Sequence, residues 1–596
     1  MRNVLRISLL LIGVLFGSIS TAFGQVLFVA KLDGSQEVPA VTTPGKGTAW
    51  AVLSGDMTSL NYRITFAKLK GTFSQAHFHV GAPGVAGGVA QAITFVGNTA
   101  SGTWSSLPDS IVRHLLRGNV YINIHTDSVA SGEIRGQLTS TIGMTASLEG
   151  SQEVPSVATG AKGTGWVRFL NADTLEYHVT VAGLQSPYSQ AHFHAAPAGV
   201  NGGVVQAMTF VDSTASGMWT NYPDSVLTHF TKGNIYMNVH TAQNTGGEIR
   251  GQLSRVGEIV LTASLDGSQE VPPVTTTGKG TAWAVLSADF STLKYQVTFA
   301  RLKGRYSQSH FHVGAEGTSG PVAQAITFAG NTASGTWTSL PDSIVRHLLR
   351  GKIYVNIHSD SVASGEIRGN LDVRNPLAFT ANLTGDQEVP VVTTGARGTA
   401  WAVLQNSAST LEYGITIAGL QGTYSQSHFH AAATGVSGGV VQAITFTDST
   451  ANGSWSGFVD SVLTHLTKGN IYINIHSTPT FTGGEIRGQL RVGSGTPTSV
   501  ERVSHEIPRS FSLHQNFPNP FNPTTVITFD LARRGKVDLK VFNLLGQEVA
   551  VLADGLYDVG TYAVTFDPRN LSTGVYFYRL SVEGGFAETR KMLLVR

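Results

Sequence analysis

The chain has 596 residues, which is too long for a single domain, and its 41% hydrophobic content is enough to build packed cores. Its 40 Lys and Arg and 38 Asp and Glu nearly balance, without a basic block, so the charge pattern gives no support for binding nucleic acid or an anionic membrane. Cysteine is absent, which excludes disulfides, thiolate metal sites and cysteine nucleophiles.

The first 24 residues have the pattern of a signal peptide. Arg2 and Arg6 give a positive start, an apolar run follows over 7–16, and Ala22 and Gly24 supply the small residues that a signal peptidase reads. The run is shorter than the ~20 residues of a membrane-spanning helix. We therefore predict cleavage before Gln25 and, because no later segment is apolar enough, no membrane span afterwards.

The body of the chain consists of four copies of one unit. Gly-Ser-Gln-Glu-Val-Pro begins at Gly34, and related strings begin at Gly150, Gly267 and Gly385. His-Phe-His and Gly-Glu-Ile-Arg-Gly also recur once in each copy. A period this long lets each unit bury its own core, unlike the short period of a solenoid. The predicted domains are 26–140, 143–255, 259–373 and 377–491.

The copies also alternate. Copies one and three share Asp-Ser-Ile-Val-Arg-His-Leu-Leu-Arg-Gly, beginning at Asp109 and Asp342. Copies two and four share Asp-Ser-Val-Leu-Thr-His, beginning at Asp224 and Asp460. The simplest history is one domain that doubled, followed by a doubling of the pair.

Each copy reads as an all-β domain. Short runs of alternating apolar residues, such as 48–53 and 60–66, are separated by Gly, Asn, Ser and Asp. About seven such runs per copy indicate a β-sandwich or a barrel. One short helix is expected over 110–116, with Asp109 or Ser110 as its N-cap and Gly118 as its stop.

Three histidines and a glutamate in each copy are candidate metal ligands. Side chains alternate between faces along a strand, so His77 and His79 share a face that points away from the core, as do His125 and Glu133. Histidines two residues apart on a strand can hold Zn or Cu with a third ligand from a neighbouring strand. Glu133 is a candidate fourth ligand or a partner that fixes a histidine tautomer. The corresponding sets are His192, His194, His240 and Glu248; His310, His312, His358 and Glu366; and His428, His430, His476 and Glu485.

A second interpretation treats the same residues as a structural polar cluster, in which His and Glu hydrogen-bond one another. Recurrent histidines on the expected helix are interpreted as structural: His114, His229, His347 and His465. Glu37 is expected to serve a turn or a strand edge beside Pro39. No nucleophile elbow, phosphate loop or dinucleotide fingerprint stands out, which favours a non-enzymatic role.

Each copy resembles the chordin-type (CHRD) domain. The resemblance is carried in copy one by 34–39, His77-Phe-His79 with 81–84, 121–126 and 132–138. It implies an extracellular β-domain. Animal chordins combine such domains with cysteine-rich modules that bind growth factors; this chain has no such modules, so growth-factor binding does not carry over. The His-x-His strand is also similar to the copper-ligand strand of Cu/Zn superoxide dismutases.

After a Gly-, Ser-, Thr- and Pro-rich linker over 492–510, residues 511–596 resemble the type A sorting domain of the type IX secretion system. The carrying segments are 515–525, 541–549, 574–579 and 591–596. Their alternating strands predict a small immunoglobulin-like sandwich. The resemblance implies export by the type IX machinery of a Gram-negative, Bacteroidota-like bacterium, with the protein secreted or held at the cell surface.

Two functions follow. The first is a secreted or surface binding protein that presents four polar sheet faces to an extracellular or cell-surface ligand, where repetition increases avidity. The second is a metal-binding extracellular protein for Zn or Cu, with a redox or hydrolytic enzyme as its bolder form.

Overall fold

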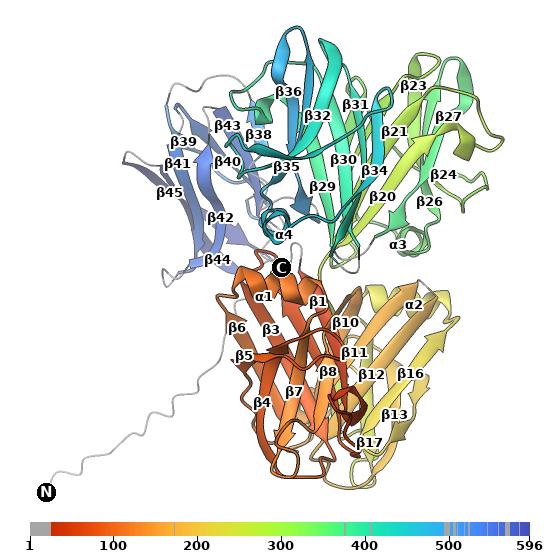
Figure 1. The fold of residues 1–596 in the computed structure, drawn as a ribbon, viewed down its shortest axis with the longest axis vertical. Helices are drawn as coiled ribbons and strands as arrows, with labels where there is room; N and C mark the ends of the chain where they lie inside the picture. Colours follow the sequence, from red (N-terminus) through yellow and green to blue (C-terminus); the bar gives the residue numbers. More distant parts are fainter. Residues whose placement is uncertain are drawn as a thin grey trace, which may run out of the picture. The chain divides into compact units, whose positions relative to one another are not determined.

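The computed structural model describes residues 25–493, except 172, 375–376 and 406–407, and residues 501–595, except 505–507, 509, 518, 522–524, 534, 545, 547, 558–559, 567–572 and 583–584. The predicted signal peptide lies outside the described residues. The chain divides into two compact units, 1–495 and 496–596. The first contains the four repeats, and each unit is described by itself (Figure 1).

Each repeat is one long antiparallel sheet with a single α-helix. Repeat 1 comprises β1 (Val26–Asp33), the 3-10 turn η1 (Gly34–Gln36), β2 (Lys46–Leu53), β3 (Ser59–Ala67), β4 (Phe73–Val80), β5 (Gly88–Ala92), β6 (Thr99–Ser105), α1 (Asp109–Leu116), β7 (Val120–Thr126), β8 (Ile134–Gln137) and β9 (Thr139–Thr141). The strands follow the order β5-β4-β7-β8-β1-β2-β3-β6, and β9 adds to β1. Repeats 2 to 4 have the same order, so the prediction of four tandem all-β, barrel-like domains is confirmed.

The other repeats differ mainly in how their short strands divide. Repeat 2 has β10 (Gly143–Glu149), η2 (Gly150–Gln152), β11 (Lys162–Asn171), β12 (Thr174–Ala182), β13 (Tyr188–Ala195), β14 (Gly203–Met208), β15 (Phe210–Val211), β16 (Thr214–Thr220), α2 (Asp224–Thr231), β17 (Ile235–Thr241), β18 (Ile249–Gln252) and β19 (Ser254–Arg255). Repeat 3 has β20 (Ile259–Asp266), η3 (Gly267–Gln269), β21 (Lys279–Leu286), β22 (Thr292–Ala300), β23 (Tyr306–Val313), β24 (Val322–Ala325), β25 (Thr332–Thr338), α3 (Asp342–Leu349), β26 (Ile353–Ser359), β27 (Val362–Asn370) and β28 (Asp372–Val373). Repeat 4 has β29 (Ala378–Thr384), η4 (Gly385–Gln387), β30 (Arg397–Leu404), β31 (Thr410–Ala418), β32 (Thr423–Ala431), β33 (Gly439–Ala443), β34 (Thr450–Ser456), α4 (Asp460–Thr467), β35 (Ile471–Thr478), β36 (Phe481–Gln489) and β37 (Arg491–Val492).

The core of a repeat is built by the inward residues of these strands. In repeat 1, Ile64 on β3, Phe78 on β4, and Ile122 and Ile124 on β7 are fully buried. The Phe78 ring packs edge-on against Tyr62 at 5.1 Å. Because alternate residues on β4 and β7 must face this core, the histidines between them face the opposite side of the sheet.

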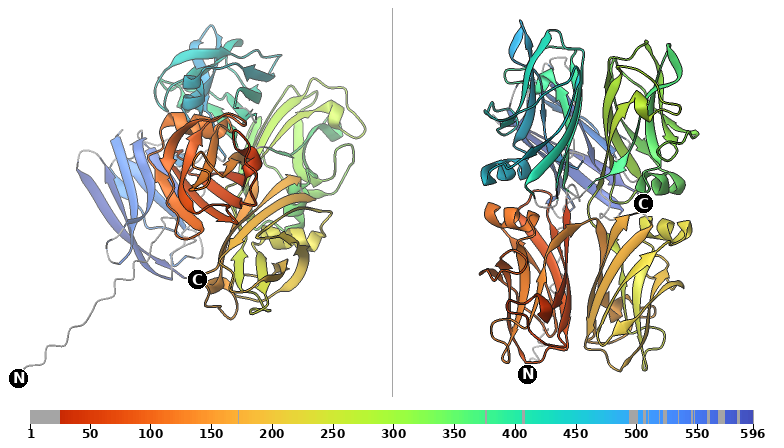
Figure 2. Two further views of the ribbon diagram at one scale, coloured as in Figure 1. Left: turned by 60° about the horizontal axis from the view of Figure 1, so that its bottom comes forward. Right: turned by 45° about the vertical axis from the view of Figure 1, so that its right-hand side comes forward.

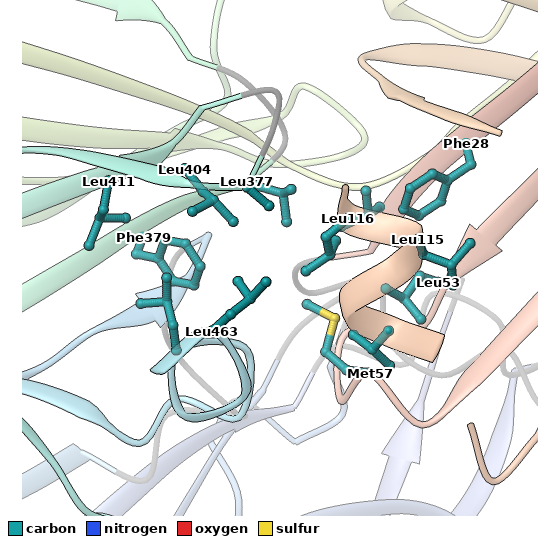
Figure 3. Close-up of a cluster of buried hydrophobic side chains, with 14 of the residues drawn as sticks. Phe28, Leu53, Met57, Leu115, Leu116, Leu377, Phe379, Leu404, Leu411 and Leu463 are labelled. Atoms are coloured by element: carbon teal, nitrogen blue, oxygen red, sulfur yellow. The ribbon is translucent and has the colours of Figure 1, made fainter. Parts of the chain in front are cut away.

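The repeats also pack against one another within the first unit. The cores of repeats 1 and 4 form one cluster, to which Leu116 of α1 contributes from repeat 1, and Leu377 and Leu463 contribute from repeat 4 (Figure 3). The outer faces of repeats 3 and 4 bury Trp283 and Trp401 in a separate cluster. Figure 2 shows all four helices near the level where the lower and upper repeats meet.

The C-terminal unit is a two-sheet sandwich. Its strands are β38 (Glu501–Ser504), β39 (Ser512–Leu513), β40 (Thr525–Leu531), β41 (Gly535–Phe542), β42 (Glu548–Tyr557), β43 (Gly560–Phe566), β44 (Gly574–Val582) and β45 (Phe586–Leu594). They form the sheets β38-β43-β40-β39 and β42-β41-β44-β45. Phe529 and Val564 of one sheet share a buried cluster with Val541 and Leu580 of the other. The predicted sandwich is confirmed, and β38 lies inside the segment expected to be a linker.

Candidate metal centres

Two adjacent strands place three histidines of each repeat on one face. In repeat 1, β4 supplies His77 and His79, and β7 supplies His125. The strands pair antiparallel, with His79 opposite Tyr121 and His77 opposite Asn123. Because directly opposed residues project from the same face, His125, two residues beyond Asn123, points the same way.

The three imidazoles converge. One ring nitrogen from each of His77, His79 and His125 lies within 4.8 Å of the other two. His77 Nδ1 and His125 Nε2 are 3.3 Å apart. Tetrahedral Zn–N bonds of ~2.0–2.1 Å would place two ligand nitrogens about 3.3 Å apart, so this spacing fits a metal.

Backbone carbonyls set the tautomers of two of these rings. His79 Nδ1 lies 2.9 Å from the carbonyl oxygen of Gly87, and His125 Nδ1 lies 3.0 Å from that of Ala130. A carbonyl can only accept, so both Nδ1 atoms carry the proton and both Nε2 lone pairs remain for the cluster. Among the described residues, the buried His79 Nε2 has no hydrogen-bond partner.

Burial favours the neutral form of His77 and His79. His79 and His125 are buried, and His77 is half-buried at the edge of the cluster. Burial, together with the nearby His125 and His79, lowers the pKa of His77. Burial also lowers the pKa of His79, against the raising effect of its bond to Gly87. Neutral imidazoles are the form that binds a metal ion.

The same arrangement occurs four times. The other groups that meet the same distance criterion are His192, His194 and His240; His310, His312 and His358; and His428, His430 and His476. In repeat 2 the contact between His192 Nδ1 and His240 Nε2 is again 3.3 Å. The ring-to-carbonyl bonds also recur, for example His430 Nδ1 to Gly438 at 2.9 Å.

A stack of three side chains supports one wall of the site. The His79 ring lies 5.0 Å from the Tyr121 ring at an interplanar angle of 14°, and the Arg135 guanidinium lies 3.5 Å from the centre of the same Tyr ring. Arg135 also donates to the carbonyl oxygens of Ala82 and Val85, each at 3.0 Å. The stack therefore ties the loop that carries Gly87 to the sheet and fixes the His79 ring.

The glutamates expected as ligands lie elsewhere, which corrects that part of the prediction. Glu133 is fully buried, and its carboxylate accepts from Lys70 N at 2.6 Å, Gly71 N at 3.2 Å and the hydroxyls of Thr43 and Thr126. These hydrogen bonds outweigh burial and lower its pKa. Equivalent hydroxyl contacts occupy the remaining members, Glu248, Glu366 and Glu485. The glutamates anchor two loops to the sheet and leave the ligand set with three histidines.

A second carboxyl, that of Glu37, also lies close to this face, although the sequence predicts only a turn or strand-edge role for it. Glu37 is 8% exposed and accepts from Asn123 Nδ2 at 3.4 Å. In the described part of the chain its Oε1 has no hydrogen-bond partner, and the same holds for Glu153, Glu270 and Glu388. Burial raises the pKa of Glu37 to about 7, although Arg135 opposes this. The recurrence of this glutamate in every copy was the one sequence signal for a role beyond the turn. It is a weak signal, because a duplication copies all residues alike.

Family comparisons agree with the repeat structure. The model described as the CHRD domain matches residues 28–138, 144–253, 261–371 and 379–490. The model described as the secretion system C-terminal sorting domain matches residues 515–595. No helix among the described residues is both long and apolar enough to cross a membrane.

Individual relatives are more distant. Chordin of Xenopus laevis is 25% identical over 294 residues, which is 45% of this chain and 31% of the chordin, and chordin of Danio rerio is 26% identical over 44% and 30%. The match therefore spans about a third of each chordin. A crystal structure of a tetra-tandem repeat in the extending region of a large adhesion protein covers 71% of this chain and 96% of its own, with 14% identity and a TM-score of 0.12.

Proposed function

The chain belongs to the CHRD domain family and ends in a secretion sorting domain, and from this premise we propose that it is a secreted metal-binding protein with one three-histidine site for zinc or copper in each repeat. The sorting domain makes it a secreted or cell-surface protein of a Bacteroidota-like bacterium, exported by engagement with the type IX machinery.

One observation carries the metal proposal. In repeat 1, backbone carbonyls hold the protons of His79 and His125 on Nδ1 and leave both Nε2 lone pairs available, and one ring nitrogen from each of the three histidines lies within 4.8 Å of the other two. A structural polar cluster would use those nitrogens in hydrogen bonds with one another, and in repeats 1 and 2 one pair of nitrogens is close enough for such a bond. In repeats 3 and 4 the corresponding nitrogens have no hydrogen-bond partner among the described residues; they are His310 Nδ1, His358 Nε2, His428 Nδ1 and His476 Nε2. Two Nε2 acceptors directed at a common point instead call for a metal ion or a donor.

The donor set limits the choice of metal. Imidazole nitrogen suits Zn, Cu, Fe and Ni, whereas Mg and Ca prefer oxygen ligands. Three protein ligands leave a fourth tetrahedral position for water or an external ligand, as in catalytic rather than structural zinc sites. His77, the most exposed of the three in repeat 1, marks the side on which that position faces solvent.

The binding role predicted from repetition is compatible with this proposal, because a metal ion with an open position can take a donor group from a partner. Four such sites on one chain would then act by avidity. The partner would carry an imidazole, a thiolate or a carboxylate.

Elemental analysis of the full chain tests the proposal. After loading with Zn or Cu and removal of excess metal, we expect one ion per cluster, hence four per chain. His77→Ala and His125→Ala should each lower the content by one. His114→Ala, on α1, is the matched control and should leave it unchanged. Metal content that is near zero, or that is the same in the wild type and in both cluster variants, would sink the proposal.

A further inference from the structure

The alternation of the repeats has a physical counterpart in how they pack. Repeats 1 and 2 meet through the outer faces of their sheets, with Thr48 Oγ1 2.7 Å from Thr180 Oγ1 and Thr65 Oγ1 2.7 Å from Thr164 Oγ1. Thr48 and Thr164 occupy equivalent positions, as do Thr65 and Thr180, so each repeat offers the same patch to the other. Such an isologous contact has approximate two-fold symmetry.

Repeats 3 and 4 form the same pair. Thr281 Oγ1 lies 2.7 Å from Thr416 Oγ1, and Thr298 Oγ1 lies 2.6 Å from Thr399 Oγ1. The first unit therefore contains two equivalent halves, 1–2 and 3–4. Each half carries one helix of the odd kind and one helix of the even kind.

The halves meet through their helices, each odd helix against an even one. Between α1 and α4, Arg117 Nη2 lies 2.7 Å from Asp460 Oδ1, and Lys468 Nζ lies 2.6 Å from Asp109 Oδ2. Each basic residue sits just after the end of its own helix and meets the aspartate in the first turn of the other. The two helices thus run antiparallel, and each aspartate also lies at the favourable end of its own helix dipole.

The contact between α2 and α3 repeats these pairs. Arg350 Nη1 lies 2.6 Å from Asp224 Oδ1, and Lys232 Nζ lies 2.6 Å from Asp342 Oδ2. Every helix has an aspartate at its N-terminal end and an arginine or lysine just after its C-terminal end, so these pairs alone would allow any helix to meet any other.

Among the positions at which the two kinds of helix differ, one changes from a charged to a neutral side chain. The fifth helical residue is Arg113 in α1 and Arg346 in α3, but Thr228 in α2 and Thr464 in α4. Arg113 Nη1 donates to Thr464 Oγ1 at 2.6 Å, and Arg346 Nη1 donates to Thr228 Oγ1 at 2.6 Å. The fifth residues therefore face each other across both contacts.

Pairing two helices of the same kind would be unfavourable, for a different reason in each case. Two odd helices in this geometry would bring two guanidinium groups together, which repel one another and must lose water. Two even helices would oppose two threonines and lose the ion pair that Arg113 Nε makes with Asp460 at 3.4 Å. Only an odd helix against an even helix satisfies both sides.

We propose that the arginine/threonine position is a pairing code, which makes the helix faces a docking surface that joins an odd CHRD repeat to an even one and holds the two halves together without the covalent connection. Each half carries both kinds of helix, and the occupant that we infer for the helix surface of one half is the other half of the same chain. This inference does not depend on metal.

The test uses the full chain with a protease site inserted between Gly257 and Glu258, in the connection between the halves. After cleavage, the wild-type halves should co-elute in gel filtration at low salt. The variant Thr228→Arg with Thr464→Arg should separate them, with association weakened by at least about tenfold. Adding Arg113→Thr and Arg346→Thr reverses the code and should restore co-elution.

Three results would overturn the proposal: wild-type halves that separate, threonine variants that co-elute as the wild type does, or a reversed code that fails to restore pairing. Circular dichroism of each cleaved half checks that it is folded. If the variant with Thr228→Arg and Thr464→Arg unfolds, the reversed-code variant alone tests the proposal. It contains the same two new arginines, and the proposal requires it to be folded and paired. The metal content of all variants should equal that of the wild type. A failure of the helix-pairing proposal can therefore be distinguished from a failure of the metal-site proposal.

Discussion

Replacing Glu133 with alanine should destabilise repeat 1 strongly without removing its metal. The carboxylate accepts from two backbone amides, those of Lys70 and Gly71, and from the hydroxyls of Thr43 and Thr126. An unsatisfied buried donor costs about 1–3 kcal/mol. Because the two hydroxyls can rotate to other acceptors while the amides cannot, we expect a loss of about 3–5 kcal/mol.

Hydrogen exchange followed by mass spectrometry is the suitable assay, since each repeat yields its own peptides and a four-repeat chain has no single unfolding transition. The expected loss corresponds to exchange about 10²–10⁴-fold faster for the most protected amides of repeat 1. Repeat 3 in the same molecule is the internal control and should not change.

His77→Ala gives the opposite pattern: it should remove the metal of repeat 1 and barely alter exchange in the metal-free protein. The reasoning is refuted if Glu133→Ala abolishes metal binding in repeat 1 while its metal-free exchange is unaffected, because the glutamate would then act as a ligand.

Four further outcomes are expected. Burial raises the pKa of Glu37 to about 7. The stability that the protonated Glu37 carboxyl contributes is therefore complete below the unfolded pKa near 4.5 and is lost as the pH rises through 7. Glu37→Gln should leave the stability of repeat 1 unchanged near pH 4 and increase it by up to roughly 3 kcal/mol at pH 8, as measured by hydrogen exchange. Gly132→Ala should destabilise repeat 1 by more than ~2 kcal/mol, because φ is 128° and the new Cβ would lie 2.4 Å from Asn123 Oδ1; an unchanged denaturation profile would contradict this. Arg135→Lys should weaken metal binding by repeat 1 alone, since lysine cannot keep both carbonyl bonds and the stack on Tyr121, and titration of repeat 1 peptides against repeat 3 measures it. Deletion of 511–596 should keep the protein inside the cell, and its appearance in the medium at the wild-type level would count against the sorting role.

The fold could be predicted from the sequence because its information is local. Alternation along β3 and β4 specifies which residues face the core, and a period of about 117 residues specifies how many cores there are. The same alternation placed His77, His79 and His125 on one face. It also led to the wrong role for Glu133, since Gly132 has a positive φ just before it and the glutamate side chain bonds to Thr126, whose own side chain lies on the other face from His125.

The features that the sequence did not reveal depend on contacts between distant segments. Glu37 lies 86 residues from its partner Asn123, and nothing in a turn motif says that its carboxyl will be buried. Arg113 and Thr464 are 351 residues apart. Taken singly, an exposed Arg or Thr on a helix carries no signal, and the alternation of the copies has meaning only once α1 is seen against α4. A duplicated chain that simply kept identical copies would have given every helix the same fifth residue. The odd and even helices instead differ in charge at the position where Arg113 faces Thr464, which is the difference that the proposed pairing code requires.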